Sequence, residues 1–316
     1  MQIPSSLQNA IEEIAAKIPL SSLKSAYQQI SEAYHRGEAS DFLFTHPTQI
    51  LAYLLARLPA TYAAVYSAMQ SLIERLPEWN CCSVLDIGSG PGTASWAAAE
   101  LFPDLSQITL LEKSEPMIAI GKQLASYSEG LALQNSHWLQ QDLTKRFALP
   151  KADLTIFSYV FAEIDCLDLI QKTWEQGTSL LIVEPGTPKG FANILAARKK
   201  LIELGAFIAA PCPHHFACPI AGWCHFPARV ERTKVHKLLK EGSLGYEDEK
   251  YSYVAASPLS PLPVEGRVVS SPLKLSGHVK LSLCTREGQI EQKTVTRKQK
   301  EIYRRARDAE WSSIWM

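Results

Sequence analysis

Apolar residues recur at two different periods along the chain, and the change of period divides the chain into regions. Between residues 5 and 77, apolar side chains such as Leu7, Ile11 and Ile14 lie three or four positions apart, which predicts amphipathic helices. The same pattern predicts helices over Thr48–Leu58 and Ala60–Leu76. This region has no cluster of reactive side chains, so we interpret it as a cap or docking surface.

From Ser83 the pattern changes to short apolar runs with strand character, separated by segments of helical periodicity. The predicted crossover helices include Thr93–Phe102 and Glu115–Ser126. Alternation of strands and helices at this spacing predicts an α/β fold with a doubly wound, Rossmann-like parallel sheet. The predicted strands are Ser83–Ile87, Gln107–Leu111, His137–Gln140, Leu154–Ser158 and Leu180–Val183.

The alternation ends after a predicted helix over Phe191–Leu204. A loop rich in proline, cysteine and histidine then runs over residues 209–227, and a linker rich in proline and serine spans residues 257–272. These changes predict three regions along the chain. They are an N-terminal helical region over 1–79, a Rossmann-like domain over 80–208 and a cysteine-bearing, basic region over 209–316.

Composition and charge exclude several classes of protein. No apolar run approaches the roughly 20 residues needed to cross a bilayer, so we expect no membrane partner. The first residues lack the order of a signal peptide and the arginine-rich, acid-poor composition of a transit peptide, which predicts a cytoplasmic protein. Residues 1–150 carry 9 basic and 14 acidic side chains, whereas residues 151–316 carry 23 and 18. Only the second half is therefore predicted to approach polyanions.

The most specific motif is a glycine-rich turn between a predicted strand and a predicted helix, in the sequence Asp-Ile-Gly-Ser-Gly-Pro-Gly-Thr that starts at Asp86. Because Gly88, Gly90 and Gly92 have no side chains, the backbone can turn sharply and approach a ligand closely. The motif therefore predicts a nucleotide-binding loop. A glycine turn without a ligand is the structural alternative.

Three carboxylates are predicted to lie at the same sheet edge as this turn. Asp86 precedes the first glycine, and Glu112 closes the second strand, where it can accept hydrogen bonds from both ribose hydroxyls. Asp142 follows the third strand, where it can reach an adenine amine. The Asp-x-Gly-x-Gly-Pro-Gly form resembles class I S-adenosylmethionine-dependent methyltransferases, which implies that these residues bind that cofactor. A nicotinamide cofactor is the alternative ligand.

No catalytic residue can be assigned from the sequence. Amine methylases of nucleic acids place Asn/Asp-Pro-Pro-Tyr/Phe after the fourth strand, but Ser158–Glu163 has neither the prolines nor the amide. Cys166 follows an aspartate, whose charge disfavours a thiolate nucleophile. We interpret Tyr159 and Phe161 as packing residues and Glu163 as a solvated carboxylate. Base stacking and general-base catalysis are the alternatives.

The chain has seven cysteines, and three of them form a cluster in the polar loop. Cys212, Cys218 and Cys224 recur with five residues between neighbours, and closely spaced cysteines in a cytosolic protein usually bind metal. Three of the others are interpreted as small buried hydrophobic residues, namely Cys81, Cys82 and Cys166.

The spacing of the cluster bears on which metal it binds. Structural zinc sites show ligand pairs two to four residues apart, and this pairing is missing. Iron–sulfur clusters accept looser spacings and often show the Cys-Pro sequence found at Cys212 and Cys218. A fourth ligand is needed, and Cys284 is the only other cysteine after the cluster. Three histidines compete with it: His214, His215 and His225. The residues alone predict a metal site and leave an iron–sulfur cluster, zinc or no metal open.

Further motifs extend the resemblance to most of the chain. They are Ala56–Ala64, Glu184–Pro188, Ala210–His214, Cys218-Pro219, Trp223–Phe226 and Gly277–Val279. Taken together, these motifs resemble the family of methyltransferase-like assembly proteins of the small ribosomal subunit, found in mitochondria and bacteria. The resemblance implies that Cys212, Cys218, Cys224 and Cys284 hold a [4Fe–4S] cluster.

The resemblance also implies association with the RNA of the small ribosomal subunit and a role in translation. Two basic runs favour RNA contact independently, because they can neutralise phosphates. The first run is Arg229, Arg232, Lys234, Lys237 and Lys240, and the second is Lys293, Arg297, Lys298, Lys300, Arg304, Arg305 and Arg307. We expect an rRNA methyltransferase that supports ribosome assembly and is monomeric off the ribosome. The alternative is a non-catalytic assembly factor that uses cofactor and cluster structurally.

Overall fold

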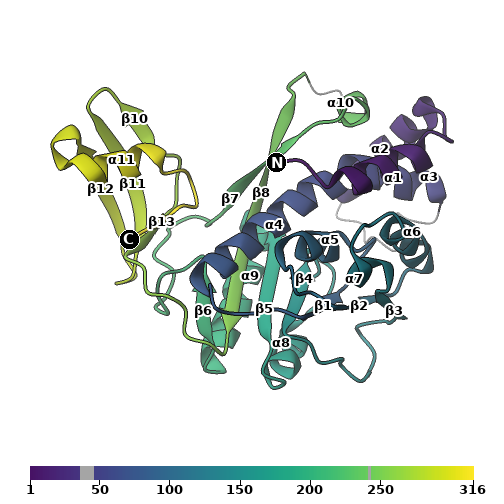
Figure 1. Ribbon diagram of the computed structural model, residues 1–316, viewed down its shortest axis with the longest axis horizontal. Helices are drawn as coiled ribbons and strands as arrows, with labels where there is room; N and C mark the ends of the chain where they lie inside the picture. Colours follow the sequence, from purple (N-terminus) through teal and green to yellow (C-terminus); the bar gives the residue numbers. More distant parts are fainter. Residues whose placement is uncertain (36–45, 241–242) are drawn as a thin grey trace. The chain divides into compact units, whose positions relative to one another are not determined.

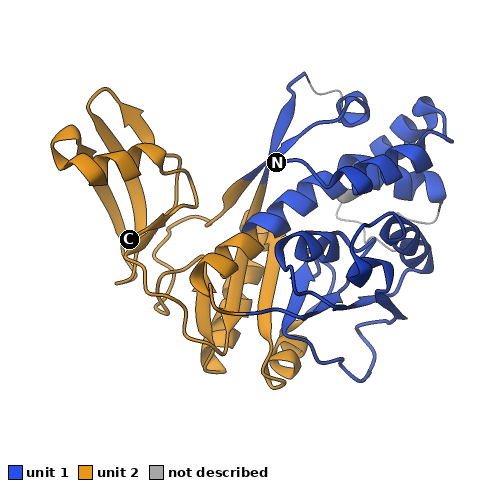
Figure 2. Cartoon of the chain, in the orientation of Figure 1, with its two compact units in different colours: residues 1–67, 80–165, 228–249 blue, residues 68–79, 166–227, 250–316 orange. Residues whose placement is uncertain are grey.

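The computed structural model describes residues 1–35, 46–240 and 243–316 (Figure 1). Within them the chain forms two compact units, each built from separate stretches of sequence (Figure 2). Unit 1 comprises Met1–Ser67, Asn80–Asp165 and Ala228–Glu249, and unit 2 comprises Ala68–Trp79, Cys166–Pro227 and Lys250–Met316. Each unit is built around secondary structure that the sequence pattern largely explains.

Four helices precede the first strand. They are α1 (Ser5–Ala15), α2 (Leu20–His35), α3 (Pro47–Ala56) and α4 (Leu58–Arg75). In unit 1, α1 and α2 both contact α3, and α1 buries the apolar face formed by Leu7, Ile11 and Ile14. Pro47 lies in the first turn of α3, where its missing N–H leaves no hydrogen bond unmade. The two helices predicted between residues 48 and 76 are confirmed to within two residues.

Unit 1 contains a parallel sheet in the order β3-β2-β1-β4. The strands are β1 (Ser83–Ile87), β2 (Gln107–Glu112), β3 (His137–Gln140) and β4 (Leu154–Ser158), and the helices between them are α5 (Thr93–Leu101), α6 (Glu115–Ala125) and α7 (Leu131–Gln134). The buried β-branched and leucine side chains of β1 and β4 account for their strand character. In this order, β2 and β4 lie on opposite sides of β1. Ligands of open α/β sheets bind at the carboxyl ends of the strands, at the point where the strand order reverses.

Unit 2 contains two strands, β5 (Ser179–Pro185) and β6 (Phe207–Ala210), that run antiparallel to β8 (Tyr246–Ser257), whose residues from Lys250 onward belong to this unit. Its helices include α8 (Leu167–Trp174) and α9 (Pro188–Glu203). β8 pairs with both β5 and β6. Its second half is buried without interruption from Tyr251 to Ser257, which is the pattern of a central strand covered on both faces.

A second sheet forms the C-terminal part of unit 2 in the order β10-β11-β9-β13, with β12 also paired to β11. Its strands are β9 (Gly266–Val268), β10 (Leu273–Leu275), β11 (His278–Thr285), β12 (Ile290–Thr296) and β13 (Ile314–Trp315). The 3-10 turn η2 (Arg297–Gln299) leads into α11 (Lys300–Asp308). Ala306 of α11 is buried in a core with Val279, Leu281 and Trp315, so the helix is anchored on one face of this sheet.

The chain after residue 204 is more regular than the sequence analysis predicts. The predicted end of the strand–helix alternation is wrong, because β6, β7 (Phe226–Glu231), α10 (Lys234–Lys240) and β8 follow. β7 pairs with β8, and α10 lies between them in sequence. The first half of β8, Tyr246–Glu249, is rich in charged residues, so its strand character comes from pairing and not from apolar periodicity.

The cysteines outside the loop follow the prediction in two of three cases. Cys81 and Cys166 are buried, as expected of small hydrophobic residues. Cys82 is exposed, because it lies just before β1, where its backbone N–H donates to Asp153. Among the described residues, none of the helices has the length and apolarity required to span a bilayer.

Candidate functional site

The glycine turn after β1 in unit 1 has the left-handed backbone that favours glycine. Gly88, Gly90 and Gly92 have φ angles of 66°, 53° and 83°. A Cβ atom at Gly88 would lie 2.8 Å from Val160 Cγ2, so the turn packs closely against the segment that follows β4. A Cβ atom at Gly90 would meet nothing within 4 Å. The middle of the turn therefore faces open space, where a ligand can approach the backbone.

Asp86 lies on β1 directly before the turn and is completely buried. Its Oδ2 accepts a 2.8 Å hydrogen bond from Ser95 Oγ, while its Oδ1 has no hydrogen-bond partner in the described part of the chain. The hydroxyl of Ser89, in the turn itself, is also buried and without such a partner. Burial raises the pKa of Asp86 to about 7, against the opposing effect of the Ser95 hydrogen bonds. This site suits a ligand that donates hydrogen bonds and carries positive charge.

Glu112 ends β2 and holds the turn in place. Its Oε2 accepts a hydrogen bond from Gly90 N, and its Oε1 accepts one from Ser114 N, both at 2.8 Å. A carboxylate offers about four acceptor positions, so two remain for other donors. The predicted role of Glu112 as ribose ligand stays a prediction.

Asp142 follows β3, at the same sheet edge, and its carboxylate is engaged in a local turn. Its Oδ1 accepts hydrogen bonds from Thr144 N at 3.0 Å and Thr144 Oγ1 at 2.7 Å, and its Oδ2 lies 3.6 Å from Lys145 Nζ. The hydrogen bonds from Thr144 lower the pKa of Asp142 and keep it ionised. Its predicted contact with adenine stays a prediction.

The segment after β4 contains a residue in an uncommon backbone conformation. Tyr159 has a φ of 62°, which an aromatic residue rarely adopts. Its hydroxyl donates a 3.4 Å hydrogen bond to Glu249 Oε1, and the same oxygen accepts a 3.1 Å hydrogen bond from Arg57 Nη2. Sequence reasoning missed this arrangement, because Arg57 and Glu249 are 192 positions apart and no local pattern joins them.

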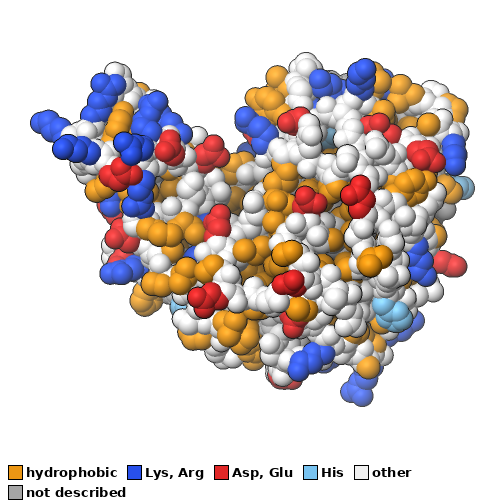
Figure 3. Space-filling view, viewed as in Figure 1, with side chains coloured by type: hydrophobic (Ala, Val, Ile, Leu, Met, Phe, Trp, Pro, Cys, Tyr) orange, Lys and Arg blue, Asp and Glu red, His pale blue; other side chains and the backbone are white. Residues whose placement is uncertain are grey.

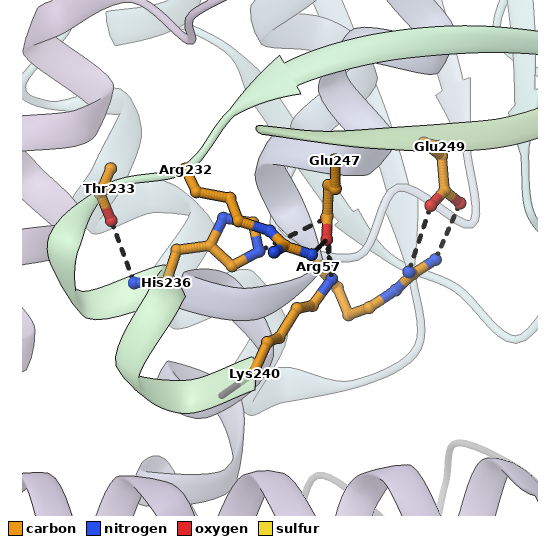
Figure 4. A network of polar contacts seen from close by, with 7 residues as sticks. All are labelled: Arg57, Arg232, Thr233, His236, Lys240, Glu247 and Glu249. Carbon is orange, nitrogen blue, oxygen red and sulfur yellow. Dashed lines mark hydrogen bonds and ion pairs between the residues drawn. The ribbon is translucent and has the colours of Figure 1, made fainter. Parts of the chain in front are cut away.

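A second group of charged residues in unit 1 surrounds Glu247 (Figure 4). Its carboxylate lies 2.9 Å from Arg232 Nη2, 2.8 Å from Lys240 Nζ and 3.4 Å from His236 Nε2. Burial alone would raise the pKa of Glu247, but the hydrogen bonds from His236, Lys240 and Arg232 outweigh it and hold the pKa well below the usual range. Glu247 is therefore a largely buried carboxylate, 13% exposed, whose charge is paired inside the protein.

The cysteine cluster lies in unit 2 and surrounds a small cavity. Cys212, Cys218 and Cys224 line this cavity together with Arg198, against an apolar wall made by Phe191, Ile194, Leu195, Pro211, Phe226 and Tyr253. Cys284, on β11, lies within electrostatic range of the other three thiols. The fold thus brings together the four cysteines that the sequence singled out.

Burial disfavours the ionised form of three thiols of this cluster, those of Cys218, Cys224 and Cys284. Burial raises the pKa of Cys284 to about 12, and it also raises the pKa values of Cys218 and Cys224. Among the described residues, no group of three or more His, Cys, Asp or Glu side chains is arranged to hold a single metal ion. In the described part of the chain, the arrangement is therefore three partly buried thiols around a cavity with the buried thiol of Cys284 near them, and not a closed single-ion site.

The three histidines of the loop have different surroundings. His214 is buried, and its Nε2 lies 3.3 Å from Cys284 Sγ. His215 Nε2 accepts a 3.0 Å hydrogen bond from the backbone of Ile208, while the ring of His225 stacks on that of Trp223. Burial lowers the pKa of His214 to about 4, so the ring beside Cys284 is neutral. Within the described residues, His214 is the loop histidine that contacts a cysteine of the cluster.

The two basic runs are not equivalent. In unit 1, three residues of the first run are engaged by carboxylates: Arg229 by Asp248, and Arg232 and Lys240 by Glu247. In unit 2, Figure 3 shows Lys and Arg side chains gathered over the C-terminal sheet and α11. The exposed members there are Arg297, Lys298, Lys300, Arg304, Arg305 and Arg307. The second run therefore offers more free positive charge to a polyanion than the first.

A comparison with protein families identifies the chain over most of its length. Residues 47–316 match the model of Rsm22, described as the mitochondrial small ribosomal subunit protein Rsm22. The chain belongs to the Rsm22 family. This confirms the resemblance to assembly proteins of the small ribosomal subunit that the motifs indicate.

Individual relatives agree with the family assignment. The human mitochondrial ribosome assembly protein METTL17 is 25% identical over 291 residues, which cover 84% of this chain and 62% of METTL17. The fission yeast mitochondrial Rsm22-cox11 tandem protein 2 is 25% identical over 326 residues, with 84% and 43% covered. The chain spans less than two thirds of the length of these two relatives.

Solved structures similar to the chain include methyltransferases. A SAM-dependent methyltransferase from Aquifex aeolicus matches 68% of this chain and 99% of its own, with 13% identity and a TM-score of 0.42. The plantazolicin methyltransferase BpumL matches 79% and 98%, with 11% identity and a TM-score of 0.40. The Rossmann-like α/β class itself follows from the parallel order β3-β2-β1-β4 and the helices between these strands.

The comparisons correct one prediction. The expected cytoplasmic location is wrong, because the family model and the human and fission yeast relatives are described as mitochondrial. The prediction used the composition of the first residues alone, and that composition is not a sufficient guide to location.

Proposed function

We propose that the Rsm22-family chain binds S-adenosylmethionine at the glycine turn of unit 1 and supports assembly of the small ribosomal subunit. In this proposal the cofactor lies over Gly88, Gly90 and Gly92, Asp86 faces its positive charge, Glu112 accepts from the ribose hydroxyls and Asp142 reaches the adenine amine. Region 80–208 is the cofactor domain, after the helical region 1–79, and region 209–316 carries the cysteine cluster.

One observation carries the cofactor proposal: the buried Oδ1 of Asp86 lacks a partner beside a turn whose middle glycine faces open space. S-adenosylmethionine carries an ammonium and a sulfonium, so it brings positive charge to a buried carboxylate that burial otherwise penalises. The bound cofactor would supply a methyl group. Asp86 and Glu112 would orient it, and Glu112 would keep the turn in shape through Gly90 N.

We further propose that Cys212, Cys218, Cys224 and Cys284 hold a [4Fe–4S] cluster, with zinc as the alternative. The donor set supports this, since three thiols of the loop line one cavity and Cys284, from a distant segment, lies within electrostatic range of them. Each cysteine of such a cluster binds a different iron, so the four sulfurs need not close on a single ion. The relatives' names mention no metal, and the proposal rests on this chain's own residues.

The partner we propose is the RNA of the small ribosomal subunit, contacted by the basic tail while the chain itself is monomeric. The human relative is named as a ribosome assembly protein. The exposed arginines and lysines between Arg297 and Arg307 supply the positive charge that phosphates require. Binding through such contacts weakens steeply as salt rises.

The reaction we propose is methyl transfer to that RNA. A specific observation favours a second candidate, a non-catalytic assembly factor: Ser158–Glu163, after β4, lacks the amide and prolines with which amine methylases orient their acceptor. In that case the cofactor would only stabilise unit 1.

The deciding experiment compares Asp86→Asn, Cys218→Ser and the exposed control Asp104→Asn in cells that lack the chain. It measures small-subunit assembly by sedimentation and transfer of tritiated methyl groups to isolated rRNA. Loss of label with Asp86→Asn alone supports the enzyme. The assembly factor is supported if no protein transfers tritiated methyl groups, if Cys218→Ser fails to restore assembly and if Asp86→Asn restores it. Normal assembly without the chain would refute both.

A further inference from the structure

Unit 2 buries three arginines whose charge has no carboxylate partner among the described residues. Arg75, Arg198 and Arg267 are 3%, 6% and 1% exposed. Burial of an unpaired guanidinium costs several kcal/mol, and proteins usually avoid it by supplying an opposite charge. Here the fold supplies backbone carbonyls instead, which leave the positive charge uncompensated.

The contacts of Arg198 and Arg267 hold both residues against the cysteine loop. Arg198 Nη2 donates a 2.8 Å hydrogen bond to the carbonyl of His214, and Arg267 Nε donates a 3.1 Å hydrogen bond to the carbonyl of Pro211. These carbonyls lie on either side of Cys212 in sequence. One nitrogen of each guanidinium, Arg198 Nε and Arg267 Nη2, is buried without a hydrogen-bond partner in the described part of the chain.

Both arginines also lie beside the thiols themselves. Arg198 lines the same cavity as Cys212, Cys218 and Cys224. Arg267, on β9, is the register partner of Cys284 on β11. The positive charges therefore lie next to all four cysteines and come from two elements, α9 and β9.

We propose that Arg198 and Arg267 are built-in counter-charges for an anionic metal–thiolate centre on Cys212, Cys218, Cys224 and Cys284, and that they control how firmly this centre is retained. Four thiolates on a zinc ion or on an oxidised [4Fe–4S] core carry two net negative charges. This charge would balance the two positive charges of the Arg198 and Arg267 guanidinium groups. The inference rests on the proposed metal centre, and it adds positioning residues that no metal-binding motif contains.

The proposal predicts effects of opposite sign on the two forms of the protein. In the metal-loaded form, Arg198 offsets the charge of the centre, so its loss should weaken metal retention. In the metal-free form, Arg198 is an unpaired buried charge, so its replacement by an apolar side chain of similar length should stabilise the protein. A purely structural arginine would stabilise both forms or neither.

The experiment uses the full chain, purified without oxygen, as wild type, Arg198→Met, Arg198→Lys and the control Lys199→Met, whose side chain is exposed on the same helix. It measures the rate of metal release to a chelator and the Tm of loaded and chelator-treated protein. With Arg198→Met we expect release at least tenfold faster, a lower Tm when loaded and a higher Tm when metal-free. Arg198→Lys should retain most of the wild-type behaviour, and Lys199→Met should match wild type.

Wild-type release with Arg198→Met, or a Tm that moves in the same direction in both forms, would overturn the inference while leaving the metal centre intact. If Arg198→Met does not fold, Arg198→Gln provides a neutral side chain that keeps a donor for the His214 carbonyl. A wild-type protein that contains neither iron nor zinc would instead refute the metal centre on which the inference rests.

Discussion

The two candidate sites bury unpaired charge of opposite sign. In unit 1 the charge is the carboxylate of Asp86, which lies beside an open glycine turn. In unit 2 the charges are the guanidinium groups of Arg198 and Arg267, which lie beside the cysteine cluster. Because an unpaired buried charge is costly, we propose that each site is completed by a ligand of the opposite charge. The sign of the unpaired charge therefore indicates which class of ligand each site would bind. A motif of residue types alone does not give this information.

The largest effect should come from breaking the unit 2 site at its most distant ligand. We expect Cys284→Ser to remove nearly all bound metal, because three thiols leave one coordination position without a sulfur donor. Metal per chain, measured by plasma mass spectrometry after anaerobic purification, tests this. Cys82→Ser is the matched control, since that thiol is exposed and outside the cluster. Full metal content in Cys284→Ser would remove Cys284 from the ligand set.

A second prediction concerns Glu247, a largely buried carboxylate that already has charged partners. Glu247 is surrounded by Arg232, Lys240 and His236, so it needs no ligand. Glu247→Gln leaves the largely buried cations Arg232 and Lys240 unpaired and should lower the free energy of unfolding by about 3 kcal/mol. Denaturant titration of the metal-free protein measures it.

The matched control is Glu301→Gln, whose partner Arg304 is 76% exposed on the side chain. Exposed ion pairs contribute less than about 1 kcal/mol, so this variant should unfold close to wild type. Equal effects of the two substitutions would show that the Glu247 contacts do not compensate its burial.

The sequence predicts the parallel strands β1 to β4 better than the elements that follow residue 204. The strands β1, β3 and β4 begin and end at the predicted residues, because each is a short run with large apolar side chains between polar segments. In contrast, β8 and β6 are missing from the prediction. Half of β8 is charged, so it has no apolar period that one sequence can reveal, and β6 ends just before the cysteine loop.

The residues of the two candidate sites also divide into those that the sequence reveals and those that it does not. The glycine turn and the cysteine loop are local in sequence, so their residue types and spacing reveal them. The groups that surround them are not local. Arg57 meets Glu249 across 192 positions, and Arg267 meets the carbonyl of Pro211 across 56. Such pairs depend on strand pairing and helix packing, which a single sequence does not specify.

The smallest effect, and the most direct test of the unit 1 half, is the pH dependence of cofactor binding. The pKa of Asp86 is raised to about 7 by burial, so the carboxyl is increasingly protonated below that pH. Since only the ionised form attracts a cationic ligand, the affinity for S-adenosylmethionine should rise roughly tenfold per pH unit up to about pH 7 and then level off. Calorimetry between pH 5.5 and 7.5 measures this, below the range in which the ligand's amino group loses its proton.

The sign for the protein without ligand is the reverse. A carboxyl whose pKa is higher in the folded state binds its proton more tightly there, so stability should fall as pH rises from about 4 to about 7. Asp86→Asn, which has no proton to lose, should abolish both trends while Asp104→Asn keeps them. An affinity of the wild type that does not change across this range would mean that the Asp86 carboxylate does not face the positive charge of the cofactor. The inference from the sign of the unpaired charge to the class of ligand would then fail for unit 1.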